Sequence, residues 1–323
     1  MFNIRAVSQT GLTLITGATG FVGSGVVARL VADDIEAIAC VRGDMVSMLE
    51  GVRVVPVAEL TANTDWRQVL VGVKSLVHLA ARVHVMHDTA ADPLTAFRSV
   101  NVDGTLNLAR QAAAAGVKRF VFVSSVKVNG ESTLPGRAFT EADAPNPQDA
   151  YGQSKLEAEQ GLRQLSADTG MEVVIIRPPL VYGPGVKANF AALMRVVHRG
   201  WPLPLGWARH NQRSLVALDN LVDFIVTCIT HPQAANQTFL VSDGQDLSTT
   251  ELVHGMAQAA GMPARLLPMP VWALQAGASL LGKGDAVQRL FGNLQVDISK
   301  ARSLLGWMPP VSVEEGLRRA MAV

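Results

Sequence analysis

The sequence predicts an α/β fold with a doubly wound parallel sheet and a smaller second domain late in the chain. Short runs of apolar and β-branched residues alternate with segments of helical periodicity, which is the pattern of β-α-β units. The first run ends at a glycine-rich turn that leads directly into a helical segment. The chain has 323 residues, more than the roughly 100–200 of a typical domain. We therefore expect two closely joined domains.

Composition narrows the functional classes. Hydrophobic residues make up 49% of the chain and charged residues 17%, which is typical of a globular enzyme. A net charge of +1 predicts no attraction for nucleic acid or for an anionic membrane. The longest late apolar stretch, residues 271–281, is about half the ~20 residues needed to cross a bilayer, so we expect a packing helix and no membrane insertion. Cys40 and Cys228 lack C-x-x-C spacing and are expected to be buried thiols of a cytoplasmic protein.

The first strand and its turn predict a dinucleotide site. Residues 12–16 form an apolar strand, residues 17–23 read Gly-Ala-Thr-Gly-Phe-Val-Gly, and apolar residues then recur at helical spacing. The three glycines permit a tight turn, close approach of a pyrophosphate and close helix–strand packing, and the helix N-terminus attracts the anion. The sheet is therefore expected to be of the Rossmann type, with cofactor contacts from Gly17, Thr19, Gly20, Phe21, Val22 and Gly23.

The residue after the second strand bears on the choice of cofactor. An NAD-preferring site normally has an acidic residue there to bind the adenosine ribose. Residues 37–41 form this strand, which ends in Val41 and is followed by Arg42. A guanidinium can pair with a 2′-phosphate, so NADP(H) is favoured and NAD(H) remains possible. The alternative is that Arg42 stacks on the adenine or ends the strand.

Two further strands, residues 52–57 and 75–79, bring more residues to the cofactor. Glu59 and Leu60 could bracket the adenine, and the small side chains of Leu79-Ala80-Ala81 would let the backbone pass close to the dinucleotide. His84, His87 and Asp88 superficially resemble a metal cluster. They fall in a predicted loop, however, and no further ligand partner stands at helical spacing from them. We expect no metal there and a loop over the active site instead.

The next helix, strand and loop lead to the reacting residues. A helix is predicted from Asn101 to about residue 115, and residues 119–124 form a strand that ends at Ser124-Ser125. Ligands of such sheets lie beyond the carboxyl ends of the strands, which places a serine hydroxyl near the substrate. After a proline-rich loop, Tyr151 and Lys155 are four residues apart on one predicted helix face. A nearby cation stabilises a phenolate and lowers the pKa of the phenol.

Five motifs in this order resemble the extended short-chain dehydrogenase/reductases, in the branch of nucleotide-sugar epimerases, dehydratases and 4-ketoreductases. They are Gly-Ala-Thr-Gly-Phe-Val-Gly, His-Leu-Ala-Ala, Asn-Val-Asp-Gly-Thr, Phe-Val-Ser-Ser and Tyr-Gly-Gln-Ser-Lys. The resemblance implies that Ser125 hydrogen-bonds the reacting oxygen and that Tyr151 is the acid/base. It implies that Lys155 binds the nicotinamide ribose and lowers the pKa of Tyr151. It also implies cofactor contacts from Asn101, Tyr151, Lys155 and Pro178.

The second half of the chain is expected to bind the nucleotide sugar. Residues 178–185 resemble the family's exit from the cofactor sheet, Asn189 opens a helix, and Arg213 resembles the arginine that clamps a nucleotide diphosphate. The cofactor domain is predicted to span residues 1–178 and about 214–241. The nucleotide-sugar domain is predicted to span about 179–213 and 242–323.

Residues beside Ser125 separate the reactions of this family. A 4,6-dehydratase has an Asp-Glu pair where this chain has Val126 and Lys127, so elimination lacks an acid and a base. Lys127 is expected either near the sugar or diphosphate, or exposed in the loop. Arg42 then favours reduction of a UDP-4-keto-6-deoxy-hexose for surface polysaccharide (O-antigen) synthesis, with UDP-hexose 4-epimerase as the alternative. A non-catalytic NADP-sensing regulator is a third hypothesis. The resemblance also suggests a homodimer.

Overall fold

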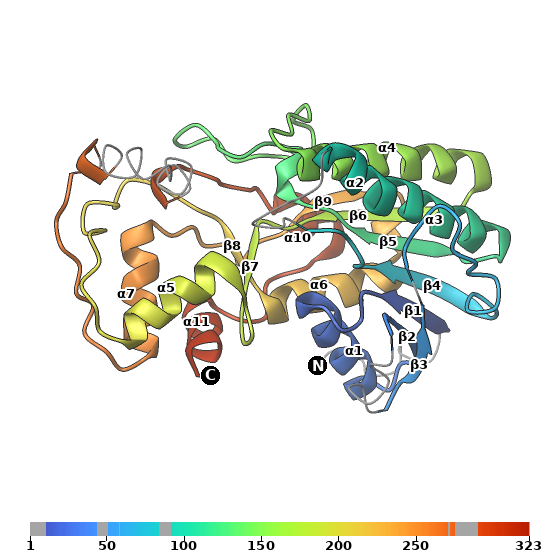
Figure 1. The fold of residues 1–323 in the computed structure, drawn as a ribbon, viewed down its shortest axis with the longest axis horizontal. Helices are drawn as coiled ribbons and strands as arrows, with labels where there is room; N and C mark the ends of the chain where they lie inside the picture. The colour runs from blue at the N-terminus through green and yellow to red at the C-terminus, as the bar shows by residue number, and fades with distance from the viewer. Residues whose placement is uncertain are drawn as a thin grey trace.

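The computed structural model describes residues 11–43, 51–57, 59–83, 92–270, 272–274 and 290–322. Seven parallel strands form the main sheet in the order β3-β2-β1-β4-β5-β6-β9. The order reverses at β1, so connections leave the sheet in both directions, and the predicted doubly wound α/β fold is confirmed (Figure 1). The strands are β1 (Leu12–Thr16), β2 (Ala37–Val41), β3 (Arg53–Pro56), β4 (Val73–His78), β5 (Arg119–Val123), β6 (Glu172–Arg177) and β9 (Thr238–Leu240).

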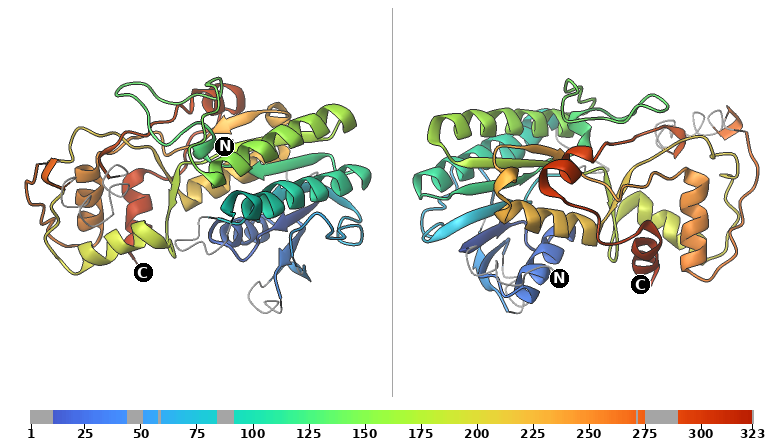
Figure 2. Two further views of the ribbon diagram at one scale, coloured as in Figure 1. Left: turned by 45° about the horizontal axis from the view of Figure 1, so that its top comes forward. Right: turned by 180° about the vertical axis from the view of Figure 1, so that it is seen from behind.

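Helices cover both faces of the sheet. On one face α1 (Phe21–Ala32) and α6 (Leu218–Thr230) pack side by side, and on the other lie α3 (Thr105–Ala114) and α4 (Ala150–Thr169) (Figures 1 and 2). The strands are nearly continuous runs of apolar residues because both of their faces are buried. Two hydrophobic clusters, one on each face, form the core of this domain.

One local prediction needs correction. The helix expected to open at Asn101 begins earlier, with α2 (Pro93–Arg98), whose first turn is capped by the Asp92 carboxylate. It continues through the π-helical segment η3 (Ser99–Gly104) into α3. Further along the chain, β8 (Leu215–Ala217) passes directly into α6. Short 3₁₀ segments follow β5 (η4, Val126–Val128) and α6 (η5, Pro232–Ala234).

The second domain has its own small sheet and core. β7 (Leu180–Tyr182) pairs in parallel with β8, and α5 (Ala188–His198), α7 (Thr249–Ala259) and α11 (Val313–Met321) pack around them. The chain returns to the first domain before α11. Residues 296–307, which include α10 (Ser299–Leu305), pack in the core beside β9, although the sequence had assigned this stretch to the second domain.

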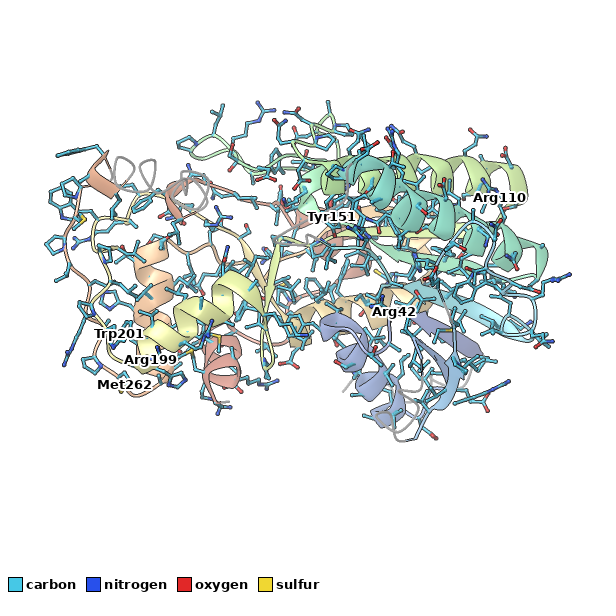
Figure 3. All side chains as sticks on the ribbon, in the orientation of Figure 1. Arg42, Arg110, Tyr151, Arg199, Trp201 and Met262 are labelled. Carbon is cyan, nitrogen blue, oxygen red and sulfur yellow. The ribbon has the colours of Figure 1, made fainter. Side chains whose placement is uncertain are left out.

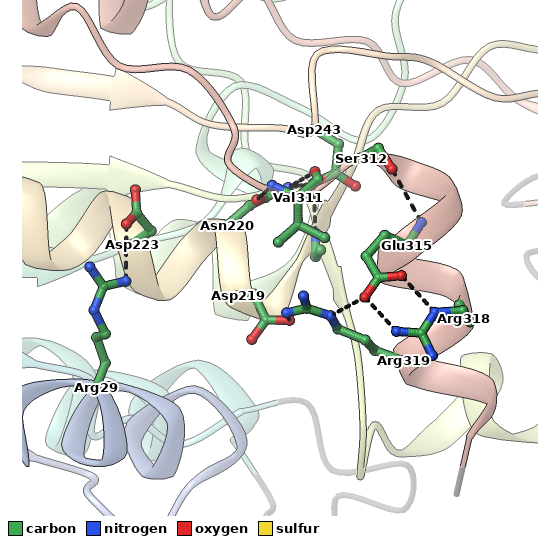
Figure 4. A network of polar contacts seen from close by, with 11 residues as sticks. Arg29, Asp219, Asn220, Asp223, Asp243, Val311, Ser312, Glu315, Arg318 and Arg319 are labelled. Carbon is green, nitrogen blue, oxygen red and sulfur yellow. Dashed lines mark hydrogen bonds and ion pairs between the residues drawn. The ribbon is translucent and has the colours of Figure 1, made fainter. Parts of the chain in front are cut away.

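A buried polar cluster fixes α11 and β8 against α6 (Figure 4). The Asp243 carboxylate accepts hydrogen bonds from the Ala217 amide (2.8 Å), the Asn220 side chain (2.7 Å) and the Tyr182 hydroxyl (2.8 Å). The Asn220 amide group also exchanges two hydrogen bonds with the backbone of Val311. Burial raises the pKa of Asp243, although the three donors oppose this shift.

Some expectations lie outside the described residues. His84, His87 and Asp88 are among them, as is most of the 271–281 stretch, of which residues 272–274 are helical. Within the part of the chain that the structure describes, no helix is long and apolar enough to cross a bilayer.

Candidate active site

The glycine-rich turn forms a cradle at the carboxyl end of β1. Gly17 has a φ of +70°, and a Cβ there would lie 2.7 Å from the Ala80 amide nitrogen. A Cβ on Gly23 would lie 2.1 Å from the Gly17 carbonyl oxygen, so the first turn of α1 packs directly against the loop. Gly20 is the N-cap of α1, with Thr19 before it and Phe21 and Val22 after it, all partly exposed. The arrangement leaves the amide groups of a helix N-terminus available to an anion.

The segment after β4 lines the other side of this cradle. The Leu79 amide donates to the Thr16 carbonyl oxygen at 3.2 Å, and Ala80 and Ala81 follow at partly buried positions. His78, at the end of β4, is fully buried between the hydroxyl groups of Thr16 (2.6 Å) and Thr105 (2.9 Å). Burial lowers the pKa of His78 to about 3, and the charge of Lys155 contributes, so this imidazole is neutral.

The predicted adenine-side residues follow β2 and β3. Arg42 is exposed directly beyond β2 (Figure 3), and Glu59 is exposed beyond β3. Leu60 is half-buried and packs against Gly104, where a Cβ would lie 2.8 Å from the Leu60 side chain. Because parallel strands end at one edge of a sheet, these residues lie at the same edge as the glycine cradle.

Ser125 and Tyr151 enter the site from neighbouring elements. Ser125 follows β5 and is the N-cap of η4, where its hydroxyl accepts a hydrogen bond from the Lys127 amide at 3.2 Å. Pro178, buried just after β6, accepts a bond from the Val126 amide at 3.0 Å and so holds the turn in place. Tyr151 lies in the first turn of α4, at the end of the helix nearest the second domain (Figures 1 and 3).

Lys155 lies one turn further along α4 and is buried. Its ammonium donates to the Val123 carbonyl oxygen at 2.9 Å and lies 4.4 Å from the ring centre of Phe122 and 6.0 Å from that of Tyr151. Burial lowers the pKa of Lys155 to about 7, although the carboxylate of Glu159 opposes the shift. Lys155 therefore lies close to Tyr151, as predicted, and its ammonium contacts the end of β5.

The electrostatics of Tyr151 differ from the expectation. Burial raises the pKa of the Tyr151 phenol, and the Asp149 carboxylate, two residues earlier, raises it further. A cation 6.0 Å from the ring does not reverse these two effects. The role of Lys155 in lowering this pKa remains a prediction.

Lys127 is engaged by carboxylates. Its ammonium pairs with Glu131 at 2.7 Å and with Asp149, whose other carboxylate oxygen caps α4 by accepting from the Gly152 amide at 2.7 Å. The side chain therefore ties the Ser125 turn to the start of the Tyr151 helix. The charge of Lys127 is already paired with these two carboxylates. The hypothesis that Lys127 contacts the sugar or diphosphate remains a prediction.

Asn101 serves the framework of the site. Its side chain accepts from the Arg82 amide at 2.8 Å, and it donates to the Arg82 carbonyl oxygen and to the Ser154 hydroxyl, both at 3.0 Å. Ser154 in turn donates to the Tyr151 carbonyl oxygen at 2.8 Å. Asn101 thus joins the segment after β4 to the active-site helix, and its predicted contact with the cofactor is untested.

The predicted substrate residues lie in the second domain. Asn189 is exposed in the first turn of α5. Arg213 precedes β8, and its backbone forms isolated β-bridges with Leu247 and Leu294. Its guanidinium donates a hydrogen bond to the Gly292 carbonyl oxygen at 3.2 Å. Their roles toward a nucleotide diphosphate remain predictions.

Sequence reasoning missed a buried ionic cluster behind the site. Glu159 is fully buried, and Arg177 binds it through two hydrogen bonds of 2.9 and 2.6 Å. The Ser124 hydroxyl donates to the same carboxylate at 2.6 Å, and Arg163 approaches from the surface at 2.9 Å. Two features of the sequence could have indicated this pair. Arg177 ends the apolar strand β6, and Glu159 lies one turn after Lys155 on the same helix, so both charges fall at positions expected to be buried.

Comparisons with known proteins agree with this geometry. The sequence model of the NAD dependent epimerase/dehydratase family matches residues 13–242. The UDP-glucose 4-epimerase of Vibrio cholerae is 51% identical over 306 residues, which are 95% of this chain and 93% of that protein.

Two solved structures share the fold. UDP-glucuronic acid 4-epimerase from Bacillus cereus, in complex with NAD, has a TM-score of 0.77 at 20% identity and covers 96% of this chain and 95% of its own. UDP-glucose 4-epimerase from Thermotoga maritima, with UDP-glucose, has a TM-score of 0.75 at 22% identity, and the coverage is 96% and 97%.

Proposed function

The chain belongs to the NAD-dependent epimerase/dehydratase family, and from this premise we propose that it interconverts the C4 epimers of a UDP-hexose. The observation that carries the proposal is the 51% identity to the Vibrio cholerae UDP-glucose 4-epimerase, which extends over both domains. The sequence alone had favoured reduction and kept epimerisation as the alternative. The comparisons support the alternative better.

The residues present fit a dinucleotide. A Cβ at Gly17 or Gly23 would fill the cradle, and the first turn of α1 offers amide groups to a pyrophosphate. Leu79 and Ala80 border the cradle and Ala81 follows them. Glu59 and Leu60 lie at the same sheet edge, where they would contact the adenine. When bound, NAD supplies a hydride acceptor that can return the hydride to the sugar.

Tyr151 and Ser125 provide the proton chemistry in this proposal. Tyr151 takes the proton of the C4 hydroxyl as the hydride leaves. The 4-keto sugar then turns over, and Tyr151 gives the proton back as the hydride returns to the opposite face of C4. The Ser125 hydroxyl donates to the same oxygen and stabilises the charge that develops there. Since burial and Asp149 raise the pKa of Tyr151, the phenolate needs a positive neighbour, and Lys155 is the buried cation within reach.

Arg42 supports a second candidate function. It is exposed beyond β2, where an acidic residue would normally bind the NAD ribose, so it can pair with a 2′-phosphate. NADP-dependent reduction of a UDP-4-keto sugar is therefore the second candidate function. Homodimer formation, a cytoplasmic location and a role in surface polysaccharide synthesis are further parts of the proposal.

The experiment follows UDP-glucose by proton NMR at its anomeric position with the purified enzyme and no added coenzyme. We expect UDP-galactose to form until equilibrium, and we expect Tyr151→Phe to abolish turnover while it still binds NAD. Ser125→Ala should retain a small fraction of the activity, because it removes a hydrogen bond and not the acid/base. Full activity of Tyr151→Phe would overturn the proposed roles.

A further inference from the structure

Two segments of the second domain form a ribbon at the end of the molecule remote from the main sheet (Figures 1 and 2). Leu203 pairs in parallel with Leu266, and backbone hydrogen bonds join the Leu203 amide to Arg265 and the Leu267 amide to Leu203. The Gly206 amide also donates to the Leu267 carbonyl oxygen at 3.0 Å. Residues 201–207 and 263–269 are therefore held side by side, and residues 272–274 follow as a short helical turn.

The ribbon exposes large apolar side chains. Trp201 is 58% exposed, Trp207 51% and Trp272 73%, and Leu267 and Met269 are 48% and 36% exposed. The two other tryptophans of the chain, Trp66 and Trp307, are buried. All three exposed tryptophans therefore lie in the ribbon or in the helical turn that follows it. We call Trp201, Trp207, Leu267, Met269 and Trp272 the tryptophan tip.

The surroundings of the tryptophan tip are basic. The sequence has no aspartate or glutamate between residues 173 and 218 or between residues 252 and 284. Arg199, Arg209 and Arg265 are exposed beside the tip, and the Arg199 guanidinium lies 5.3 Å from the ring centre of Trp201 (Figure 3). Glu251 is the acidic residue just before the second interval, and its carboxylate accepts the Ser248 amide in a capping box. The net charge of +1 conceals this local excess of cations.

We propose that the tryptophan tip docks the enzyme on the surface of a bilayer that contains anionic phospholipid. Indole rings prefer the boundary between acyl chains and headgroups, because one part of the ring is apolar and the other donates a hydrogen bond. Arginines next to such an apolar surface add attraction to anionic headgroups. A second copy of the chain fits the tip less well, since a twofold contact would set arginines against arginines.

The proposed docking depends on surface residues of the tip alone, whereas Ser125 lies after β5 and Tyr151 and Lys155 lie on α4. It is therefore independent of the proposed reaction. Binding on the plane of the membrane needs no spanning helix and is distinct from insertion.

The test uses the whole protein and vesicles of phosphatidylcholine, alone or mixed with phosphatidylglycerol. We expect the protein to sediment with the anionic vesicles, to bind the neutral ones much more weakly, and to dissociate as salt is raised. The emission of the exposed tryptophans should shift to shorter wavelength in the bound state. Each of Arg199→Gln, Arg209→Gln and Arg265→Gln should weaken partitioning about fivefold at low salt.

Variants distinguish binding through the tryptophan tip from non-specific hydrophobic adsorption to vesicles. The triple variant Trp201→Ser, Trp207→Ser, Trp272→Ser should lose at least tenfold in partitioning and keep the far-UV circular dichroism spectrum of the wild type. Leu134→Ser removes another exposed apolar side chain, 68% exposed in the first domain, and should change nothing. Equal binding by the triple variant would overturn the proposal. So would absence of binding to anionic vesicles at low salt, or a change of oligomeric state in the triple variant that identifies the tip as a contact between copies.

Discussion

Replacing Arg177 with methionine tests whether the buried ionic cluster supports the active site. The Arg177 side chain is 3% exposed, and it binds the fully buried Glu159 carboxylate at 2.9 and 2.6 Å and the Asn129 side chain at 3.0 Å. Removing one partner of a buried ion pair leaves an uncompensated charge, which costs about 3–5 kcal/mol. Ser124 and Arg163 still donate to Glu159 in the variant, so we expect a loss near the lower bound, about 3 kcal/mol.

Arg177→Met should also lower the catalytic rate. Ser124 precedes Ser125 and donates to Glu159, while Glu159 lies one turn after Lys155 on α4. The cluster thus sets the spacing between the Ser125 turn and the Tyr151 helix. We expect kcat of Arg177→Met to fall at temperatures where the variant is still folded, with KM changed less.

Urea unfolding followed by circular dichroism measures the free energy of unfolding, with two controls. Arg163 binds the same carboxylate, but its side chain is 45% exposed, so Arg163→Met should lose no more than about 1 kcal/mol. The double variant Glu159→Gln, Arg177→Met removes both charges and should recover part of the loss. Equal losses from Arg177→Met and Arg163→Met, both below about 1 kcal/mol, would refute the reasoning.

Three further predictions concern the site itself. Gly23→Ala should abolish dinucleotide retention, measured by absorbance after denaturing extraction, because its Cβ would lie 2.1 Å from the Gly17 carbonyl oxygen. In the control Gly72→Ala no atom lies within 4 Å of the added Cβ, so the change brings only the backbone strain of a φ of +79° and should leave retention intact. Lys155 has its pKa lowered to about 7 in the fold, so between about pH 7 and 10 the unfolded chain binds more protons. Unfolding free energy of the wild type should therefore rise with pH relative to Lys155→Met, and parallel profiles would contradict the burial of this ammonium. Lys127→Met should remove the cation beside the Asp149 carboxylate and so raise the pKa of Tyr151, which moves the ascending limb of the kcat/KM profile to higher pH. Lys127→Arg should restore the wild-type profile, and an unshifted limb in Lys127→Met would exclude this coupling.

Local signals in the sequence predicted much of the fold. The glycine spacing after β1, the apolar strands and the helical face of Tyr151 and Lys155 each depend on residues within about one or two turns, and the structure places them as expected. The start of α2 was missed because Asn101 resembled a helix beginning, whereas the stronger signal was Asp92 before Pro93, a cap with proline in the first turn.

Long-range pairings could not be read from local patterns. Three such pairings are the Arg177 and Glu159 pair, the return of residues 296–307 to the first domain, and the ion pair between Lys127 and Asp149. Their separation in the sequence follows no spacing rule. Burial of Tyr151 also follows from tertiary packing, and together with the nearby Asp149 carboxylate it raises the pKa of the phenol. The tryptophan tip shows the same limit, because a net charge near neutral conceals where the charges lie.

The fate of the hydrogen at C4 tests the proposed function most directly. The purified enzyme is incubated in ordinary water, without added coenzyme, with UDP-glucose that carries deuterium at C4. Epimerisation returns the same hydride to the same carbon, so we predict UDP-galactose that retains the deuterium, and NAD in the denatured extract of the enzyme. Absence of any C4 epimer, together with stoichiometric oxidation of NADPH when a UDP-4-keto sugar is supplied, would contradict the epimerase and establish the reductase.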